Sequence, residues 1–581
     1  MSGGTDRPAV SVVVPTYNCG AHLDPLVTSL SRQGLPPGGY EVIFADDGST
    51  DDTPRRLDEL AAADPQVRVL HLEHSGWPSH PRNQGLEQAR GEYVFFADDD
   101  DWFGDEALAR LHACAHDHGA DIVIGRMIGH RRGVPRELFR ENRFDATLAN
   151  APLADSMTCH KLFRRSFLDR HGLRFPEGHP RRLEDHRLMA AAYLLAERIC
   201  VLADHPCYHH ARRQDAGNVT ATRMDPAEYY AALREALDIV DAHRPPAAAR
   251  LRLHRRWLRK EMLNRLRGQA LLSAPEHWVE QVAAEVGQLV KERVAPDAIA
   301  GVPPMYQVIA HLAAQGRMAD LRRLAEWEVS VRAHAAVDRW QVEGRTLTVA
   351  VSAHLRAGDE PLRFDDRGLP VLPMAEATPD GVVMRAGGAR TDVVIRRRET
   401  REEFFLPVDA TTEPAADGQV CHRSTATVDF ATLDGGRARG TWEVRARVIQ
   451  AGWALDANLP LVVRCADGGT PRVEDPRRLR ARIRRAVRRI RERTLGRTAR
   501  AGSRSHDRPA AARREGFGDP GSSSALSPEC AITGRPGGAL DRSPVGCETV
   551  CRPVSWGFDE QRVAAARGRS AGCAVVRAQA R

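Results

Sequence analysis

Residues 92–102 read EYVFFADDDDW, an apolar run that ends in four consecutive aspartates. The aromatic and aliphatic residues of this run indicate a buried strand. The end of a buried strand is a costly place for four acids unless a cation offsets their mutual repulsion. Mg²⁺ and Mn²⁺ prefer carboxylate and phosphate oxygens, so we expect Asp98 and Asp100 to bind a divalent metal. The alternative is an acidic turn that begins the next helix.

Four further apolar runs are separated by amphipathic stretches that are typical of helices. Their alternation predicts an α/β domain built on a largely parallel sheet. The runs are VSVVVP from Val10, EVIFAD from Glu41, VRVLHL from Val67 and DIVIG from Asp121. The helices that we expect between the strands cover residues 22–33, 52–63, 81–89 and 105–118.

Polar residues follow the first two strands, at the sheet edge where open α/β folds bind ligands. Pro15, Thr16 and Tyr17 follow the first strand, and Asp46 and Asp47 end the second. Hydroxyls, an aromatic ring and carboxylates together suit a nucleoside, because a carboxylate accepts hydrogen bonds from a base or a ribose. The alternative, a loop that only caps the next helix, does not explain the paired acids.

Two other segments place charged residues at the start of a helix. Arg82 and Asn83 begin one helix, where Arg82 can face a phosphate or instead pair with the aspartates. Glu184 and Asp185 precede the apolar helix 188–196, so that one acid can cap the helix while the other serves as a general base. Capping alone is the alternative reading of the second segment.

The rest of the chain changes pattern twice. Apolar residues at three- and four-residue spacing predict a helical connector over residues 225–335. Alternation of apolar and polar residues then predicts a β-sandwich-like domain over residues 336–466. Residues 475–500 form a predicted basic amphipathic helix that suits an anionic membrane or a polyanionic polymer, with a solvated tail as the alternative. Residues 501–581 lack periodicity, and we expect them to be disordered.

Composition argues against several classes of protein. No run approaches the ~20 apolar residues of a membrane-spanning helix, and the N-terminus lacks the pattern of a signal peptide, so we expect a cytoplasmic protein. The chain has 11 cysteines without CxxC pairs, which argues against a disulfide framework and a structural zinc site. We expect His205, His209 and His210 to form a phosphate-facing or solvated surface rather than a metal site. The basic tail lacks interleaved aromatic residues, so we expect no nucleic-acid binding.

The residues from Val10 to about Thr222 resemble the family 2 glycosyltransferases, which have the GT-A fold. The segments that carry the resemblance are SVVVPTYN, FADDGSTDDT, PRNQGLEQARGEYVFFADDDDW, HKLFRRSFL and LEDHRL, in the order and at the spacing of the family. The resemblance implies an α/β GT-A (Rossmann-like) catalytic domain over residues 1–224, followed by the connector and the β-sandwich-like domain.

The resemblance also implies roles for particular residues. Asp98 and Asp100 become the metal-binding DXD element for Mn²⁺ or Mg²⁺, and Asp185, with Glu184 beside it, becomes the catalytic base. His160 and Lys161 become candidates for the sugar or acceptor pocket. The expected donor-binding residues, taken from the strand ends and from the resemblance, are Pro15, Thr16, Tyr17, Asp46, Asp47, Arg82, Asn83, Asp98 and Asp99.

The connector and the β-rich region look most similar to wall teichoic acid β-N-acetylglucosaminyltransferases, through WQVEGRTLTVAVSAHL (Trp340 to Leu355) and its surroundings. That similarity implies a homo-oligomer, with a trimer as the expected form. We therefore expect an inverting, metal-dependent glycosyltransferase of cell-wall biogenesis, peripheral at the inner face of the membrane. It would transfer a sugar from a UDP-sugar such as UDP-GlcNAc to a hydroxyl of a teichoic-acid-like poly(alditol phosphate).

Three other functions compete with this expectation. One is transfer to another polysaccharide or to a glycolipid. Another is a protein that binds sugar nucleotides or polyanions without turnover, against which the intact set of acids argues. The third, a nucleotidyltransferase, needs a glycine-rich basic loop after the first strand, and PTYNCGAHL offers no Lys or Arg there.

Overall fold

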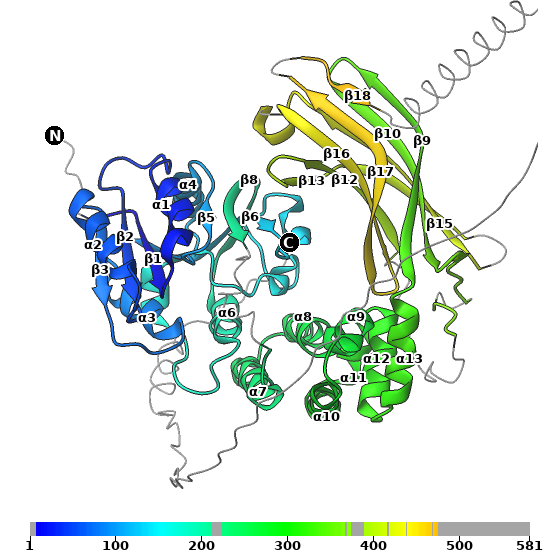
Figure 1. Cartoon of the computed structure of the whole chain (residues 1–581), viewed down its shortest axis with the longest axis horizontal. Coiled ribbons are helices and arrows are strands. Elements are labelled where there is room, and N and C mark those ends of the chain that lie inside the picture. Colours follow the sequence, from blue (N-terminus) through cyan, green and yellow to red (C-terminus); the bar gives the residue numbers. More distant parts are fainter. Residues whose placement is uncertain are drawn as a thin grey trace, which may run out of the picture. The chain divides into compact units, whose positions relative to one another are not determined.

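The computed structural model describes residues 7–211, 223–365, 369–373, 389–414, 418–436, 438–466 and 469–474. Three sets of elements follow one another along this part of the chain: a mixed α/β sheet, a group of helices and two antiparallel sheets (Figure 1). The expected fold class is thereby confirmed. The predicted basic helix (475–500) and the predicted disordered tail (501–581) lie outside the described residues.

The first set is built on an eight-stranded sheet with the order β3-β2-β1-β4-β7-β6-β8-β5. β1 pairs in parallel with β2 and β4, and β2 pairs in parallel with β3. The strands are β1 (Val10–Thr16), β2 (Tyr40–Asp46), β3 (Val67–His71), β4 (Tyr93–Phe96), β5 (Trp102–Phe103), β6 (Ile122–His130), β7 (Leu162–Arg164) and β8 (Ile199–Ala211). The parallel strands end at the same edge, which brings their following loops together.

Helices connect these strands and bury the apolar side chains of the sheet. α3 packs against β1 and β2, and α4 packs against β6 and β8. The α-helices are α1 (Asp24–Leu30), α2 (Thr53–Ala63), α3 (Ser79–Gln88), α4 (Ala107–His118), α5 (Arg165–Arg170) and α6 (Glu184–Leu195), with short 3₁₀ turns η1 (Gly20–Leu23), η2 (Arg136–Arg140) and η3 (Leu153–Asp155). No helix in the described ranges has the length and apolar character needed to cross a bilayer.

The sheet is more mixed than the sequence indicated. β7 runs antiparallel to both of its neighbours, and the short β5 runs antiparallel to β8. β8 pairs with β6 through a register shift at Arg126, which lies opposite Pro206. Proline has no N–H for the ladder and is found in strands mainly at edges and irregularities, so this segment does not read as a regular strand.

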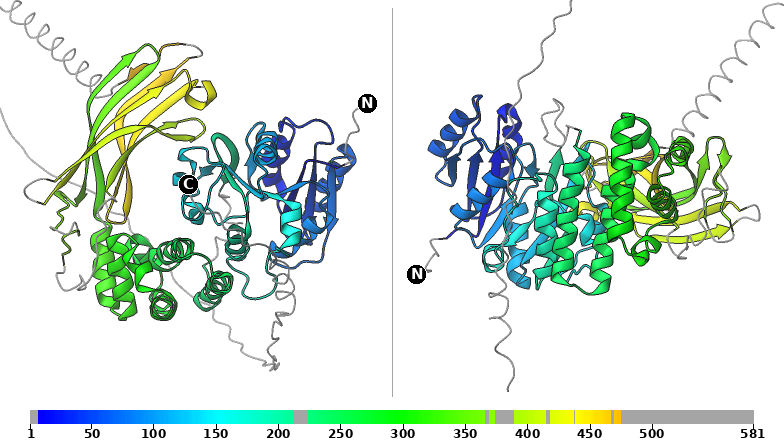
Figure 2. Two further views of the ribbon diagram at one scale, coloured as in Figure 1. Left: turned by 180° about the vertical axis from the view of Figure 1, so that it is seen from behind. Right: turned by 90° about the horizontal axis from the view of Figure 1, so that it is seen from below.

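Helices occupy the chain from Pro226 to Glu328, as predicted for the connector, but the last residues of its expected range, 331–335, already belong to strand β9 (Val331–Glu343). The helices lie side by side in Figure 2 (right), and α10 packs against α7 and α12. The elements are α7 (Pro226–His243), α8 (Ala247–Trp257), η5 (Leu258–Met262), η6 (Leu263–Leu266), α9 (Gly268–Leu272), α10 (Glu276–Arg293), α11 (Pro296–Ala300), α12 (Pro304–Ala314) and α13 (Met318–Glu328). η5 is a π-helical turn, a feature that frequently marks functional sites.

Two antiparallel sheets follow the helices. One has the order β11-β10-β15-β14, with β9 paired to β10, and the other has the order β13-β12-β16-β17-β18. Side chains of β10 alternate between buried and half-buried positions, which is the period of a strand with one face in a core. The strands are β9 (Val331–Glu343), β10 (Thr346–Ala357), β11 (Glu360–Pro361), β12 (Arg390–Arg397), β13 (Glu403–Phe405), β14 (Val408–Pro414), β15 (Val420–Asp429), β16 (Gly440–Gln450), β17 (Trp453–Cys465) and β18 (Arg472–Glu474), with one 3₁₀ turn, η8 (Leu433–Gly436).

Candidate active site

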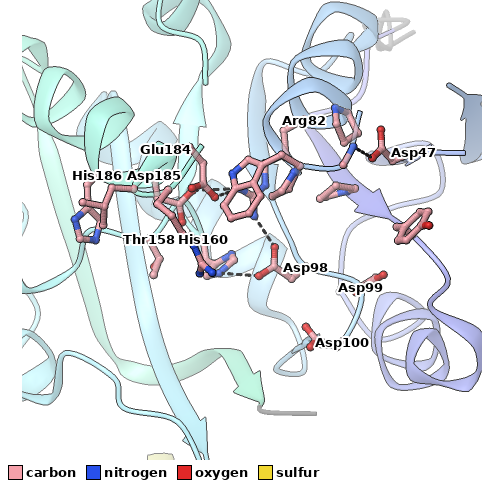
Figure 3. Close-up of a pocket in the computed structure, with 18 of the residues that line it drawn as sticks. Asp47, Arg82, Asp98, Asp99, Asp100, Thr158, His160, Glu184, Asp185 and His186 are labelled. Carbon is pink, nitrogen blue, oxygen red and sulfur yellow. Dashed lines mark hydrogen bonds and ion pairs between the residues drawn. The ribbon is translucent and has the colours of Figure 1, made fainter. Parts of the chain in front are cut away.

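A cavity of about 700 Å³ lies at the edge of the sheet where β1, β2 and β4 end. Its wall includes the end of β1, the aspartate run after β4 and the start of α6. Figure 3 shows the labelled acids on two sides of this cavity, with the Arg82 side chain between them. The sequence segments that we singled out for chemistry therefore meet in one place.

One end of the cavity carries an exposed aromatic ring. Tyr17 is 42% exposed and stacks on His74, with ring centroids 4.3 Å apart. Asp47 lies beside them, and its carboxylate accepts hydrogen bonds from the Ser75 amide at 2.9 Å, the Ser75 hydroxyl at 2.7 Å and the Gly76 amide at 3.0 Å. The loop that holds His74 is thus fixed to the end of β2, and the Tyr17 ring stays open for a planar ligand.

Arg82 is buried between carboxylates from two elements. Its guanidinium donates to Asp98 Oδ1 at 2.8 Å, to Asp185 Oδ1 at 3.2 Å and to Glu184 Oε1 at 3.5 Å. The ring of Phe175 lies under the same group, 5.1 Å from its central carbon. Arg82 therefore pairs with the acids, which was the alternative reading of this residue, while it also lines the cavity.

Burial and neighbouring charges shift the pKa values of these acids in opposite directions. Burial alone would raise the pKa of Asp98, but His160 and Arg82 lower it below its ordinary value. Burial, together with the negative charge of Asp185, raises the pKa of Glu184 to about 7. Two carboxyl groups on either side of one guanidinium thus differ in their readiness to hold a proton, as expected of groups with different roles.

A cluster of carboxylates and imidazoles lies behind the aspartate run. Potential ligand atoms of Asp98, Asp101, His160 and His210 all lie within 4.8 Å of one another. Asp101 Oδ2 and His210 Nε2 are buried and have no hydrogen-bond partner among the described residues. Burial, with Asp98 and Asp100 adding to it, raises the pKa of Asp101 well above its ordinary value. A divalent cation would satisfy both orphaned atoms, and the mixed oxygen and nitrogen donors suit a transition metal such as Mn²⁺.

Two histidines of β8 are buried, which differs from what the sequence led us to expect. We expected His205, His209 and His210 to lie on a phosphate-facing or solvated surface, but His205 and His210 are each only 4% exposed. β8 places His210 beside the aspartate run, and Asp101 accepts a hydrogen bond from the Ala211 amide at 2.7 Å. These residues are about 110 positions apart in the sequence, so local spacing carries no signal of their contact.

The helical connector completes the wall of the cavity. Tyr229 of α7 and Arg265 of η6 both line it. The Trp257 indole donates to Nδ1 of His186, the residue after Asp185, at 3.3 Å. Sequence patterns identified the connector as helical but not as part of the site, because a helical period does not say which sheet edge a helix contacts.

Eleven of the residues selected from the sequence line the cavity: Pro15, Thr16, Tyr17, Asp47, Arg82, Asp98, Asp99, Asp100, His160, Glu184 and Asp185. Three selected residues do not. Asp46 accepts a hydrogen bond from the Ser49 hydroxyl beneath the site, Asn83 donates to the Phe175 carbonyl at 2.8 Å, and Lys161 donates to the Thr158 carbonyl. These three hold the loops and helix ends that carry the lining residues.

Comparison with known families identifies two segments of the chain. Residues 11–172 match the model of glycosyl transferase family 2, and residues 226–325 match that of the glycosyl transferase TarS linker domain. The first segment contains the end of β1 and the aspartate run, and the second contains Tyr229 and Arg265.

Individual relatives agree with both matches. The chain is 34% identical over 258 residues to the poly(ribitol-phosphate) β-N-acetylglucosaminyltransferase TarS of Staphylococcus aureus, which covers 44% of each protein. It is 32% identical over 246 residues to a poly(ribitol-phosphate) β-glucosyltransferase of Bacillus spizizenii, covering 42% of this chain and 38% of the relative. The matches thus span less than half of the length of these curated relatives.

Among solved structures, the chain is similar to Staphylococcus aureus TarS 1-349 in complex with UDP-GlcNAc, with a TM-score of 0.49 and 25% identity, covering 61% of this chain and 99% of that one. Each of the two matched segments contributes lining residues to the cavity, and the Glu184–Asp185 pair and His210 lie between them in the sequence. Residues 11–172 are a glycosyl transferase family 2 domain, and residues 226–325 that follow it are a linker domain of the TarS type.

Proposed function

We propose that this protein is an inverting glycosyltransferase that transfers a sugar from a UDP-sugar to a hydroxyl group of a poly(ribitol phosphate)-like polymer of the cell envelope. The observation that carries the proposal is one cavity in which the aspartate run after β4 faces the Glu184–Asp185 pair across Arg82. UDP-GlcNAc is the first candidate donor and UDP-glucose the second, because the two relatives are named for these sugars.

In this proposal the nucleoside lies at the Tyr17 end of the cavity. The exposed Tyr17 ring stacks on the uracil base. The loop that Asp47 fixes through Ser75 and Gly76 carries His74, which stacks on the Tyr17 ring. Pro15, Thr16 and Asp46 support this end from the strand tips. Asp99, Asp98 and Arg82 line the part of the cavity that receives the ribose and the diphosphate.

The proposal includes a divalent cation, Mn²⁺ or Mg²⁺. Asp98 and Asp100 of the DXD element are its expected ligands, and the orphaned atoms of Asp101 and His210 favour their participation. When bound, such a cation offsets the negative charge of the diphosphate leaving group. Without it, burial and the charges of Asp98 and Asp100 favour the neutral form of Asp101, in line with its raised pKa.

Asp185 is the proposed general base. Its carboxylate accepts the proton of the acceptor hydroxyl as the hydroxyl oxygen attacks the anomeric carbon. The bond from that carbon to the diphosphate oxygen breaks, and its electron pair leaves with UDP. Attack from the face opposite to UDP inverts the configuration. Arg82 orients Asp185. Glu184 and His160 line the surrounding pocket, and Lys161 supports it through the carbonyl of Thr158.

Several wider assignments belong to the same proposal. The catalytic domain comprises residues 1–224, the connector 225–335 and the β-sandwich-like domain 336–466. In the same proposal the basic segment 475–500 contacts an anionic membrane or the polymer, and the protein acts in the cytoplasm as a homo-oligomer, with a trimer as the expected form. Transfer to another polysaccharide or to a glycolipid, and binding of sugar nucleotides without turnover, are the competing functions.

The proposal is tested by supplying purified protein with a panel of UDP-sugars, Mn²⁺ or Mg²⁺, and a synthetic poly(ribitol phosphate) acceptor. We expect UDP release with one donor, dependence on the cation and a product whose anomeric configuration, read by NMR, is opposite to that of the donor. Donor binding without UDP release under any acceptor condition would favour the binding protein, and a retained configuration would contradict inversion.

A further inference from the structure

A second cavity, of about 520 Å³, has six arginines in its wall, and we call it the arginine-lined cavity. One wall is formed by β6 and the residues that follow it, and the other by residues 396–405. The arginines of its wall are Arg126, Arg131, Arg132, Arg136, Arg396 and Arg401, and Glu403 is the one acid among the lining residues. Such a concentration of one sign of charge is unfavourable unless anions offset it.

The acid of this cavity is already engaged by other cations. Glu403 Oε2 lies 3.3 Å from Arg136 Nε and 3.4 Å from a guanidinium nitrogen of Arg447. Within the described ranges, Arg131, Arg132, Arg396 and Arg401 form no ion pair with a carboxylate. The Arg396 Nε atom is also buried without a hydrogen-bond partner in that part of the chain. Among the described residues, Arg131, Arg396 and Arg401 therefore lack a carboxylate partner, whereas the charge of Arg132 acts on Asp98.

Titratable neighbours respond to this positive field. Burial lowers the pKa of His130, and the charge of Arg401 lowers it further. Burial also lowers the pKa of Arg136, with Arg447 and Arg445 acting in the same direction against Glu403. Burial is the main cause of both shifts, and the positive charges of nearby arginines add to it.

The arginine-lined cavity adjoins the candidate active site. Arg132 lines both cavities, and its charge contributes to the low pKa of Asp98. Arg132 also donates to the Ala211 carbonyl at 3.3 Å, next to His210 of the metal cluster. An extended ligand lying over Arg132 therefore reaches from one cavity into the other.

We propose that the arginine-lined cavity binds phosphodiester groups of the acceptor polymer and so holds the polymer beside the transfer site. Guanidinium forks bind phosphate oxygens in pairs, and a polymer with one negative charge in every repeat supplies anions to several arginines at once. The identity of the polymer as an acceptor rests on the proposed transferase function, whereas its binding does not require turnover.

The test uses the full chain and a fluorescent, synthetic ribitol phosphate octamer. Arg131→Gln/Arg401→Gln removes two of the uncompensated charges and leaves the lining of the active-site cavity intact. We expect the Kd for the octamer to rise by roughly tenfold and its salt dependence to weaken, because the variant loses two charged contacts at exposed side chains, where water and salt screen each of them. The affinity for UDP-GlcNAc with Mn²⁺, measured by calorimetry, should not change.

A matched double variant, Arg170→Gln/Arg323→Gln, removes two arginines that line neither cavity and should bind the octamer as the unchanged protein does. Equal octamer affinity in both double variants would overturn the proposal. So would octamer binding too weak to measure in the unchanged protein while phosphatidylglycerol vesicles bind through Arg131 and Arg401. Octamer binding that depends on these arginines, without sugar transfer, would uphold the cavity assignment and contradict only the transferase function.

Discussion

Replacing Arg82 with glutamine tests how the candidate active site is held together. Arg82 is 4% exposed and lies within hydrogen-bonding distance of Asp98, Asp185 and Glu184, at 2.8, 3.2 and 3.5 Å. Glutamine keeps a polar side chain but removes the positive charge that the three carboxylates share. Arg82→Gln therefore leaves acids from the end of β4 and from α6 facing one another without their common cation.

The expected cost is large because the pairing is buried. Removing one partner of a buried ion pair typically costs about 3–5 kcal/mol. The acid side chains remain 13–25% exposed, so water offsets part of this loss and we expect a value of about 3 kcal/mol. Asp98, whose pKa lies below its ordinary value of 3.8, contributes this stability above pH 4 and loses it as the pH falls through its folded-state pKa. The deficit of the variant is therefore fully present at neutral pH.

Urea unfolding of the two proteins at pH 7.5 measures the difference, with and without Mn²⁺. Added Mn²⁺ should shrink the deficit, because a cation at Asp98 replaces part of the missing charge. Arg55→Gln is the matched control: Arg55 is 63% exposed, pairs with Asp52 and Glu59, and should cost less than about 1 kcal/mol. A loss in Arg82→Gln no larger than in this control would refute the argument that one guanidinium holds the acids in place.

Three further predictions concern the site and its support. Burial and Asp185 raise the pKa of Glu184 from 4.5 to about 7. Between these two pH values, Glu184 holds a proton in the folded protein but has released it in the unfolded chain. The free energy of unfolding of the unchanged protein should therefore fall by roughly 3 kcal/mol between urea unfolding at pH 5 and at pH 8, and Glu184→Gln should remove this slope. If the buried Nε2 atom of His210 is a metal ligand, His210→Ala should weaken Mn²⁺ binding by about tenfold or more. Electron paramagnetic resonance measures this affinity, and an unchanged value would remove His210 from the metal site. In Gly85→Ala the new Cβ would lie 2.4 Å from Val13 Cγ1, so we expect a loss of about 1–2 kcal/mol in thermal unfolding rather than the usual gain of an alanine in a helix.

The parallel part of the sheet was predictable because its signals are local. Apolar runs at β1, β2 and β4 are each followed directly by polar residues, and parallel strands bring such strand ends to one edge. The places of Asp47 and Asp98 in the cavity follow from that geometry, whereas Asp185, at the start of α6, was expected from the acids that precede an apolar helix and from the family resemblance.

The remaining part of the site depends on contacts between distant segments. His210 reaches Asp98 and Asp101 only because β8, interrupted by Pro206, joins the sheet beside β6. The antiparallel β7 is three residues long, too short for a periodic pattern to appear. Tyr229 and Arg265 enter the cavity through the packing of α7 against α6, which no single segment encodes.

The role of Asp185 is the centre of the proposed mechanism, and Asp185→Asn tests it most directly. Asparagine keeps the size of the side chain and a hydrogen-bonding oxygen for Arg82, but it does not accept the proton of the acceptor hydroxyl. The measurement is the rate of sugar transfer from UDP-GlcNAc to poly(ribitol phosphate) with Mn²⁺, together with the donor Kd. A general base contributes about 10²–10⁴-fold, so we predict a loss of that size in kcat with an unchanged donor Kd. Transfer within tenfold of the unchanged protein would contradict the assignment of Asp185 as the base.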